Sequence, residues 1–178
     1  MKSANSRTAA AKVVNPCTVY VSAGSNIEPA KHLRMACAAL ADAYGPLTTS
    51  SVYRNQAVGF DGDDFLNMVV GFNTDATPQS ISDFLQQVHD RAGRPRNSTG
   101  FVSRIIDLDL LLYGDQIIDT DELSVPREDI NRYGFVLGPL AEIAPDLCHP
   151  ANGHTMAELW DSFDRDQHPL TKLRISPL

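Results

Sequence analysis

Apolar residues recur at helical spacing in two segments of this chain. The first stripe, between Pro29 and Gly45, consists of Leu33, Cys37, Leu40 and Tyr44. The second, between Thr77 and Gly93, consists of Ile81, Phe84, Leu85 and Val88. Proline suits the first turn of a helix, glycine commonly ends one, and this spacing places each stripe on one helix face. The sequence therefore predicts helices over residues 29–44 and 78–92.

Strands are predicted in four short segments that alternate or are continuously apolar: residues 17–23, 47–54, 64–73 and 105–113. Gly114 and Asp115 then suit a turn, after which we expect residues 116–119 to pair back as a hairpin strand. Two short helices are expected over residues 135–144 and 155–163. The order is β-α-β-β-α-β with a hairpin strand and further helices.

That order is typical of a ferredoxin-like α+β fold, in which helices pack on an antiparallel sheet. We expect one domain over residues 17–163, a size that suits a single core. Residues 1–16 are small, polar and free of acids, which favours a disordered tail and leaves a transit peptide as the alternative. Residues 164–178 lack periodicity, so we expect a second, loose tail there.

Two aspartates interrupt the apolar strand over residues 105–113. Asp107 and Asp109 are two residues apart, so their side chains share one face, with Cα atoms about 6.6 Å apart. The pair could lie on a solvated face, although Ile105 and Leu111 on that face are apolar. A buried carboxylate pair is costly unless positive charge lies against it. Divalent metal ions carrying a polyphosphate would supply that charge.

Arginine is concentrated immediately upstream of this strand. Four arginines fall within fourteen residues: Arg91, Arg94, Arg96 and Arg104. The guanidinium fork suits phosphate, whereas the formal net charge of −7 argues against a nucleic-acid surface as the main role. A local arginine cluster in an acidic protein therefore indicates a small anionic ligand.

The cysteine count and the length of the apolar runs indicate the cellular compartment of the protein. The three cysteines, Cys17, Cys37 and Cys148, are odd in number and scattered, which fits reduced thiols in a cytoplasmic protein. We also expect no membrane association, because no apolar run approaches membrane-spanning length. The sequence does not determine the oligomeric state, for which we assume a monomer.

The chain resembles the 6-hydroxymethyl-7,8-dihydropterin pyrophosphokinases of the folate pathway from about Thr18 to Phe163. The residues that carry this resemblance are Gly24-Ser25-Asn26, Ser51-Val52-Tyr53-Arg54, Phe65-Leu66-Asn67, Gly93-Arg94-Pro95-Arg96, Arg104 with Asp107-Leu108-Asp109, Val125-Pro126, Gly134-Phe135, Pro139-Leu140 and Glu142-Ile143-Ala144-Pro145. The arginine–aspartate block together with the later proline motif is the specific part. The family has a ferredoxin-like core, in agreement with the predicted order of elements.

The resemblance implies transfer of pyrophosphate from ATP to the pterin hydroxymethyl group, with release of AMP. It implies two Mg²⁺ ions on Asp107 and Asp109, and phosphate contacts from Arg94 and Arg104. The implied nucleotide-side residues are Gln86, Arg96 and Arg127. The implied pterin-side residues are Asn55, Val58, Phe65, Asn67 and Phe135, with the ring stacked between the two phenylalanines. From the residues alone, both phenylalanines could equally be core side chains.

Several positions depart from the family pattern. They are His89, where an acidic residue is usual; Phe101-Val102-Ser103, in place of Trp-Gly-Pro; Arg127-Glu128, in place of His-Tyr; Tyr133, in place of arginine; and the loop Asn55-Gln56-Ala57-Val58. Most of these lie on the expected nucleotide side. They motivate one alternative, a diverged paralogue that binds pterin with lost or altered transfer. A ferredoxin-like RNA-binding module is a further alternative, which the acidic charge and missing aromatic RNA signature oppose.

Overall fold

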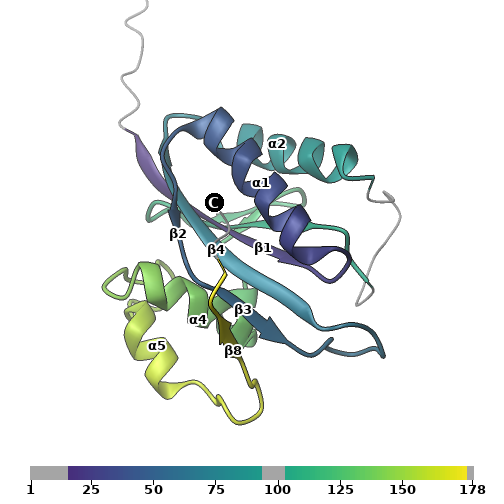
Figure 1. The fold of residues 1–178 in the computed structure, drawn as a ribbon. Coiled ribbons are helices and arrows are strands. Elements are labelled where there is room, and N and C mark those ends of the chain that lie inside the picture. The colour runs from purple at the N-terminus through teal and green to yellow at the C-terminus, as the bar shows by residue number, and fades with distance from the viewer. Residues whose placement is uncertain (1–15, 94–102, 176–178) are drawn as a thin grey trace, which may run out of the picture.

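An antiparallel sheet with helices on both faces forms the body of the protein (Figure 1). The structure is a computed structural model and describes residues 16–93 and 103–175. Its elements are β1 (Cys17–Ser25), α1 (Pro29–Tyr44), β2 (Thr48–Thr49), β3 (Val52–Asn55), β4 (Phe65–Thr74), α2 (Pro78–Arg91), β5 (Asp107–Tyr113), β6 (Ile118–Asp119), β7 (Ser124–Val125), α3 (Asp129–Arg132), α4 (Gly134–Ile143), α5 (Met156–Ser162) and β8 (Thr171–Leu173). The predicted α+β class is confirmed.

The strand order of the sheet is β5-β1-β4-β3-β8, with β2 also pairing with β4. Every pairing is antiparallel. The register places Gly24 of β1 between Asp107 of β5 and Asn67 of β4. Two residues earlier on β1, Ser22 is paired with Asp109. Residues from three distant parts of the chain therefore form rows that run from the edge strand β5 across β1 to β4.

The two faces of the sheet are covered by different helices. Side chains of β1 alternate, so Val19, Val21 and Ala23 pack with the stripes of α1 and α2 in one core. On the opposite face, α4 and α5 cover a second core that includes Val69 and the adjacent Leu111-Leu112 of β5. The β5–β1 register shifts between Tyr20 and Val21, and this irregularity lets two successive leucines of β5 join that core.

The predicted helices over residues 29–44 and 78–92 are confirmed, with α1 at Pro29–Tyr44 and α2 at Pro78–Arg91. The single strand predicted over residues 47–54 is wrong, because it is divided into β2 and β3. At the break, Ser50 Oγ accepts a hydrogen bond from the Val69 backbone N–H at 2.9 Å, and the Ser51 N–H donates to the Glu142 carboxylate at 3.0 Å. The Ser50 N–H still donates to the Val69 carbonyl at 2.9 Å, but the Val69 and Ser51 N–H groups are bonded to side chains, which interrupts the regular ladder there.

The predicted hairpin between β5 and residues 116–119 is also wrong. Strand β6 pairs instead with β7, in a separate two-stranded sheet. The outer edge of β5 is already occupied: the Leu108 N–H donates to His89 Nε2 at 2.8 Å, and the Leu111 carbonyl accepts from the Arg127 N–H at 2.9 Å. Buried backbone groups need partners, and these contacts supply them without a hairpin strand.

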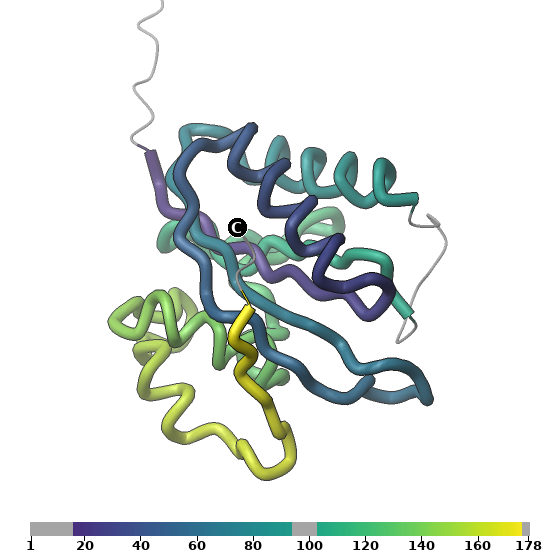
Figure 2. The backbone as a smooth tube through the Cα atoms, in the orientation of Figure 1, coloured from purple at the N-terminus to yellow at the C-terminus, as the bar shows by residue number. Residues whose placement is uncertain are grey.

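The expected loose tail over residues 164–178 contains a strand. Thr171–Leu173 forms β8, which pairs antiparallel with β3, and the yellow end of the backbone follows β3 in both views (Figure 1, Figure 2). Its Lys172 Nζ lies 2.8 Å from Glu142 Oε1 on α4. Residues 1–15 lie outside the described part of the chain. Among residues 16–93 and 103–175, no helix has the length and apolar character that a membrane crossing requires.

Glu142 connects three elements through its carboxylate. It accepts hydrogen bonds from Ser51 Oγ at 2.8 Å, Tyr53 Oη at 2.9 Å and Lys172 Nζ at 2.8 Å, besides the Ser51 N–H. Partial burial raises the pKa of Glu142, but the donors from Lys172, Ser51 and Tyr53 outweigh this and lower it. Burial and the nearby Glu142 carboxylate raise the pKa of Tyr53 to about 12.

We expect Glu142→Gln to lower the free energy of unfolding by about 1–3 kcal/mol at neutral pH, because one amide oxygen cannot serve all four donors. A carboxylate with a lowered folded-state pKa stabilises the protein above its unfolded-state pKa. That stabilisation is lost as the pH falls through the folded-state pKa. Urea denaturation from pH 7 to pH 3 should therefore show a shallower acid loss in Glu142→Gln than in the wild type. The exposed Asp166→Asn serves as control, and equal acid profiles for all three proteins would contradict this role.

Candidate active site

The floor of the candidate site is the part of the sheet that α4 leaves uncovered. Ser22 and Gly24 of β1 lie there, flanked by Asp109 and Asp107 on one side and by Asn67 on the other. In β5 the residues on either side of each aspartate, such as Leu108 and Leu110, are buried in the opposite core, and the aspartates are half-buried. The prediction that both carboxylates share one face of a strand is confirmed.

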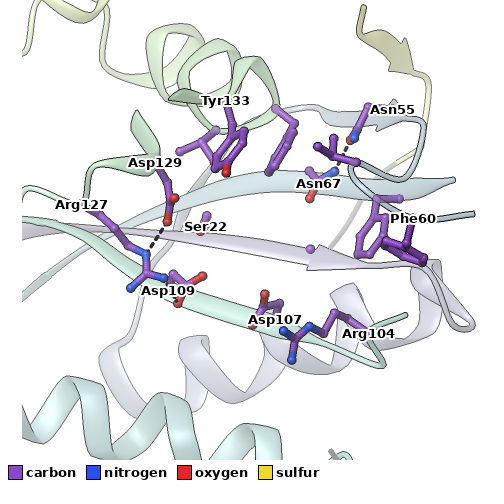
Figure 3. A pocket seen from close by; sticks show the side chains of 15 residues that line it. Ser22, Asn55, Phe60, Asn67, Arg104, Asp107, Asp109, Arg127, Asp129 and Tyr133 are labelled. Carbon is purple, nitrogen blue, oxygen red and sulfur yellow. Dashed lines mark hydrogen bonds and ion pairs between the residues drawn. The ribbon is translucent and has the colours of Figure 1, made fainter. Parts of the chain in front are cut away.

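A cavity of about 280 Å³ opens above this floor (Figure 3). Its lining residues are Ser22, Gly24, Asn55, Val58, Phe60, Phe65, Asn67, Arg104, Asp107, Asp109, Arg127, Asp129, Tyr133, Phe135 and Val136. Arg127, Asp129 and Asp109 lie at one end, with Tyr133 near them, and Asn55, Asn67 and Phe60 lie at the other. Asp107 and Arg104 lie side by side along the lower edge of the view in Figure 3. The predicted pterin-side residues are all brought together here, as are Arg104, Arg127 and both aspartates.

Asn67 is held by its neighbours on both sides. Its side chain is almost fully buried, and its Nδ2 donates to Asn55 Oδ1 at 2.5 Å. A Cβ atom at position 24 would lie 2.5 Å from Asn67 Oδ1, closer than real Cβ contacts allow. Gly24 therefore gives the amide the room that it occupies, and the Asn55 contact fixes its orientation. The fixed amide suits recognition of a ligand with a polar edge.

Four aromatic side chains of the cavity form two pairs. Phe65 meets Phe60 edge to face, with ring centroids 6.2 Å apart and an interplanar angle of 90°. Phe135 stacks on Tyr133, with centroids 5.0 Å apart and an angle of 15°. The two phenylalanines that the resemblance assigns to the pterin therefore each have an aromatic partner. Such apolar walls with a few fixed polar groups are typical of small-molecule sites.

The segment Gly24-Ser25-Asn26 positions the residues that precede β5. Asn26 Oδ1 accepts from the Arg104 N–H at 2.7 Å, and the Arg104 carbonyl accepts from the Asn26 and Ile27 N–H groups. Ser25 Oγ donates to the Ile105 carbonyl at 2.5 Å. These bonds fix the backbone at Arg104, which places its side chain at the edge of the cavity beside Asp107 (Figure 3).

Arg127 lies between two carboxylates at the charged end. Its Nη2 is 3.2 Å from Asp109 Oδ1, and its Nε donates to Asp129 Oδ2 at 2.6 Å. Burial lowers the pKa of Arg127, but the charges of Asp109, Asp129 and Asp107 outweigh it and raise the pKa. The guanidinium is therefore charged and held within the site.

A second, more polar cavity of about 370 Å³ adjoins the first. Its lining includes Gln86 and His89 of α2 and Glu122, Leu123 and Ser124 near β7. Asp107, Asp109 and Arg127 line both cavities. Gln86, which is predicted to lie on the nucleotide side, lines this second cavity together with the acid pair.

His89, one of the positions that depart from the family pattern, has a structural contact. It is almost fully buried on α2, and its Nε2 accepts the Leu108 N–H, which comes from the residue between the two aspartates. The imidazole thus fixes the outer edge of β5 where the acid pair lies.

Sequence reasoning missed several lining residues. Phe60 lies in a loop with no periodic pattern, and Asp129 begins a helix of one turn, so neither carried a signal of its own. Asp129 could have been found as the second carboxylate near Arg127. Ser22 was hidden in an ordinary strand pattern. Arg94 and Arg96, which the resemblance assigns to the phosphate and nucleotide side, lie outside the described residues, as does Phe101, one of the departures from the family pattern.

The oxygen ligands in the site suit magnesium. Asp107 and Asp109 supply carboxylates from one rigid strand. Within the described ranges, no group of three or more acidic, histidine or cysteine side chains is arranged around a metal position. A pair of carboxylates fits an ion that keeps several waters and takes its other ligands from phosphate, as Mg²⁺ does.

Comparison with known proteins gives consistent matches. The family model described as 7,8-dihydro-6-hydroxymethylpterin-pyrophosphokinase (HPPK) matches residues 20–145. A 2-amino-4-hydroxy-6-hydroxymethyldihydropteridine pyrophosphokinase from Haemophilus influenzae is 36% identical over 160 residues, covering 88% of this chain and 98% of that protein. The Bacillus subtilis protein of the same name is 38% identical over 132 residues, covering 72% of this chain and 78% of that protein.

Solved structures agree on the fold. A Plasmodium falciparum HPPK-DHPS triple mutant superposes with a TM-score of 0.71 at 12% identity, covering 93% of this chain and 46% of that chain. This chain spans about half the length of the Plasmodium chain, and at that identity the likeness concerns the fold alone. The family model covers most of the sheet and both cavities, and the bacterial relatives match over most of their own length. The chain belongs to the 7,8-dihydro-6-hydroxymethylpterin-pyrophosphokinase family.

Proposed function

We propose that this chain transfers pyrophosphate from ATP to the hydroxymethyl group of 6-hydroxymethyl-7,8-dihydropterin, giving AMP, in folate biosynthesis. The observation that carries this proposal is the position of Asp107 and Asp109. Both lie on the wall shared by an aromatic cavity and a polar cavity. A reaction that joins a flat acceptor to a polyphosphate needs the phosphates at such a boundary. Membership in the pyrophosphokinase family supports the same reaction.

The aromatic cavity suits the pterin. A flat bicyclic ring can stack between Phe65 and Phe135, while the amide of Asn67 pairs with its polar edge. Asn55 orients that amide through its 2.5 Å hydrogen bond, and Val58 contributes an apolar contact at the mouth. In this pose the hydroxymethyl group faces the charged end of the cavity, where the aspartates lie.

The polar cavity suits the nucleotide. Gln86 offers an amide from α2, and Arg127 offers a guanidinium group from the wall that the two cavities share. Arg104 offers a second guanidinium group to the phosphates from the edge of the aromatic cavity. The acceptor oxygen forms a bond to the β-phosphorus of ATP, the bond from that phosphorus to the α-phosphate oxygen breaks, and the hydroxyl proton is released. Phosphoryl transfer of this kind depends on positioning and charge stabilisation, which rigid strand residues supply.

Asp107 and Asp109 would hold the Mg²⁺ ions. When bound there, Mg²⁺ would neutralise phosphate charge. The residues of this chain do the remaining work: Arg104 stabilises charge at the edge of the cavity, and His89 keeps β5 in position through the Leu108 N–H. The aromatic side chains exclude water, which otherwise competes with the pterin hydroxyl as acceptor.

The departures from the family pattern do not favour a different function. Tyr133 supports Phe135 by stacking, and His89 supports β5 by its hydrogen bond, so both positions have a role in the site as built. The paralogue without transfer activity and the RNA-binding module have no support among the relatives. The assumed cytoplasmic location and monomeric state stay predictions.

The purified full chain, supplied with ATP, Mg²⁺ and 6-hydroxymethyl-7,8-dihydropterin, should form AMP and the pyrophosphorylated pterin in equal amounts. Mass spectrometry of the pterin product and AMP quantification would measure both. The Asp107→Ala variant provides the background. Pterin binding with AMP formation no greater than that background would instead support the diverged paralogue and reject the transfer.

A further inference from the structure

The contacts of Arg127 place a built-in positive charge against a carboxylate of the acid pair. Its backbone N–H donates to the Leu111 carbonyl, so its main chain is fixed to the strand that carries Asp109. The side chain then reaches Asp109 at 3.2 Å and Asp129 at 2.6 Å. Figure 3 shows the guanidinium between these two carboxylates. The shorter contact is to Asp129, which leaves the Asp109 contact as the one that can be exchanged.

The side chain of Arg127 also lies at the boundary where the proposed function places the phosphates. Arg127 lines both cavities, together with Asp107 and Asp109. Its side chain keeps 41% of its surface exposed, so it is accessible to a ligand from solvent. A guanidinium at this boundary can contact either the Asp109 carboxylate or a phosphate, because both ligands present oxygen atoms in a planar or forked arrangement.

We propose that Arg127 serves as the counter-cation of Asp109 before substrate binds and moves to the polyphosphate when the metal–nucleotide complex arrives. This inference rests on the proposed function. A divalent cation and a guanidinium that share one carboxylate repel each other, so Arg127 competes with the bare cation for Asp109. A triphosphate offers Arg127 a new partner and removes the competition. The site therefore takes up the cation weakly by itself and strongly with nucleotide.

The proposal predicts that one substitution changes two affinities in opposite directions. In Arg127→Ala, Mn²⁺ alone should bind about tenfold more tightly than in the wild type, and the Mg²⁺ complex of α,β-methylene-ATP should bind about tenfold more weakly. Electron paramagnetic resonance of free Mn²⁺ measures the first affinity, and calorimetry measures the second. A merely structural role for Arg127 would weaken both.

Matched variants make the test specific. Arg132→Ala removes an exposed arginine on α3 that pairs with Glu128 and lines neither cavity, so both affinities should stay at the wild-type level. Asp109→Asn should abolish the tighter Mn²⁺ binding when combined with Arg127→Ala, which locates the ion at this carboxylate. Arg127→Gln removes the charge but keeps most of the length, and it repeats the test should the alanine variant fail to fold. Arg127→Lys should restore weak Mn²⁺ binding because the charge is kept.

Unchanged or weaker Mn²⁺ binding in Arg127→Ala and Arg127→Gln overturns the proposal, as does unchanged nucleotide affinity. The AMP assay on the wild type is separate. A wild type that makes AMP, with Mn²⁺ affinity unaffected by loss of Arg127, rejects the inference and leaves the proposed function in place. A wild type that makes no AMP, with Mn²⁺ binding tightened in both variants, rejects the function and supports the competition at Asp109.

Discussion

Replacing Asp109 with asparagine is expected to lower AMP formation by about a thousand-fold, while the protein stays folded. Asparagine has nearly the same shape as aspartate, so packing against β1 is kept, but the charge that faces the phosphate region is lost. Removal of one preorganised charged or polar group from a transfer site typically costs a factor of about 10² to 10³. Under the proposed function Asp109 is also a cation ligand, and its loss adds to this, since the neutral amide holds Mg²⁺ poorly.

Steady-state AMP release, with thermal unfolding as a check on stability, measures this effect. Asp107→Asn should fall to a similar level, because both carboxylates lie on the wall between the two cavities. The exposed Asp119→Asn on β6 is the matched control and should keep full activity. Retention of more than a tenth of the wild-type rate by Asp109→Asn would argue against the role of the acid pair.

Replacing Gly24 with alanine is expected to raise the KM for the pterin by about ten- to a hundred-fold. The added Cβ would lie 2.5 Å from Asn67 Oδ1. The amide must then leave its position, which breaks its hydrogen bond with Asn55. It also misplaces the group to which the proposed function assigns recognition of the polar edge of the ring. A buried polar group that loses its partner costs about 1–3 kcal/mol, which corresponds to the expected loss of affinity.

A double-mutant cycle with Asn67→Ala tests the mechanism of this loss. Asn67→Ala removes both the clash and the contact, so Gly24→Ala should add little further damage in its presence. Initial rates at varied pterin concentration give KM and kcat for the four proteins. Additive effects of the two substitutions would show that Gly24 acts by another route, such as a change in the pairing of β1.

The sequence contained most of the fold because local signals and tertiary packing agree over long elements. In α1 the proline, the apolar stripe and the terminal glycine all indicate the same helix, and both bounds were predicted correctly. The errors occur where side chains far apart in sequence replace backbone pairing. Ser50 and Glu142 divide one predicted strand, and His89 with Arg127 occupies the edge where the hairpin was expected. Such contacts leave no periodic pattern.

In the candidate site, too, some residues could be predicted from the sequence and others become evident only in the folded chain. Asp107 and Asp109 were identified because polar residues inside apolar strands are costly and therefore informative, whereas Asn67 was assigned to the site by the resemblance. Their mutual placement depends on the register of β1 with its two neighbours, which the sequence pattern alone does not specify. Phe60 and Asp129 come from a loop and a one-turn helix, so only the folded chain shows that they belong to the site.

The last strand has a practical consequence for shortened versions of this enzyme. β8 covers the outer hydrogen-bonding edge of β3, from Val52 to Arg54. A chain cut after Phe163 would leave that edge bare, and an uncovered strand edge is a template for pairing with another molecule. Trimmed variants made for screening or crystal growth would therefore tend to self-associate through β3, far from the acid pair, and their loss from solution would say nothing about the chemistry of the site.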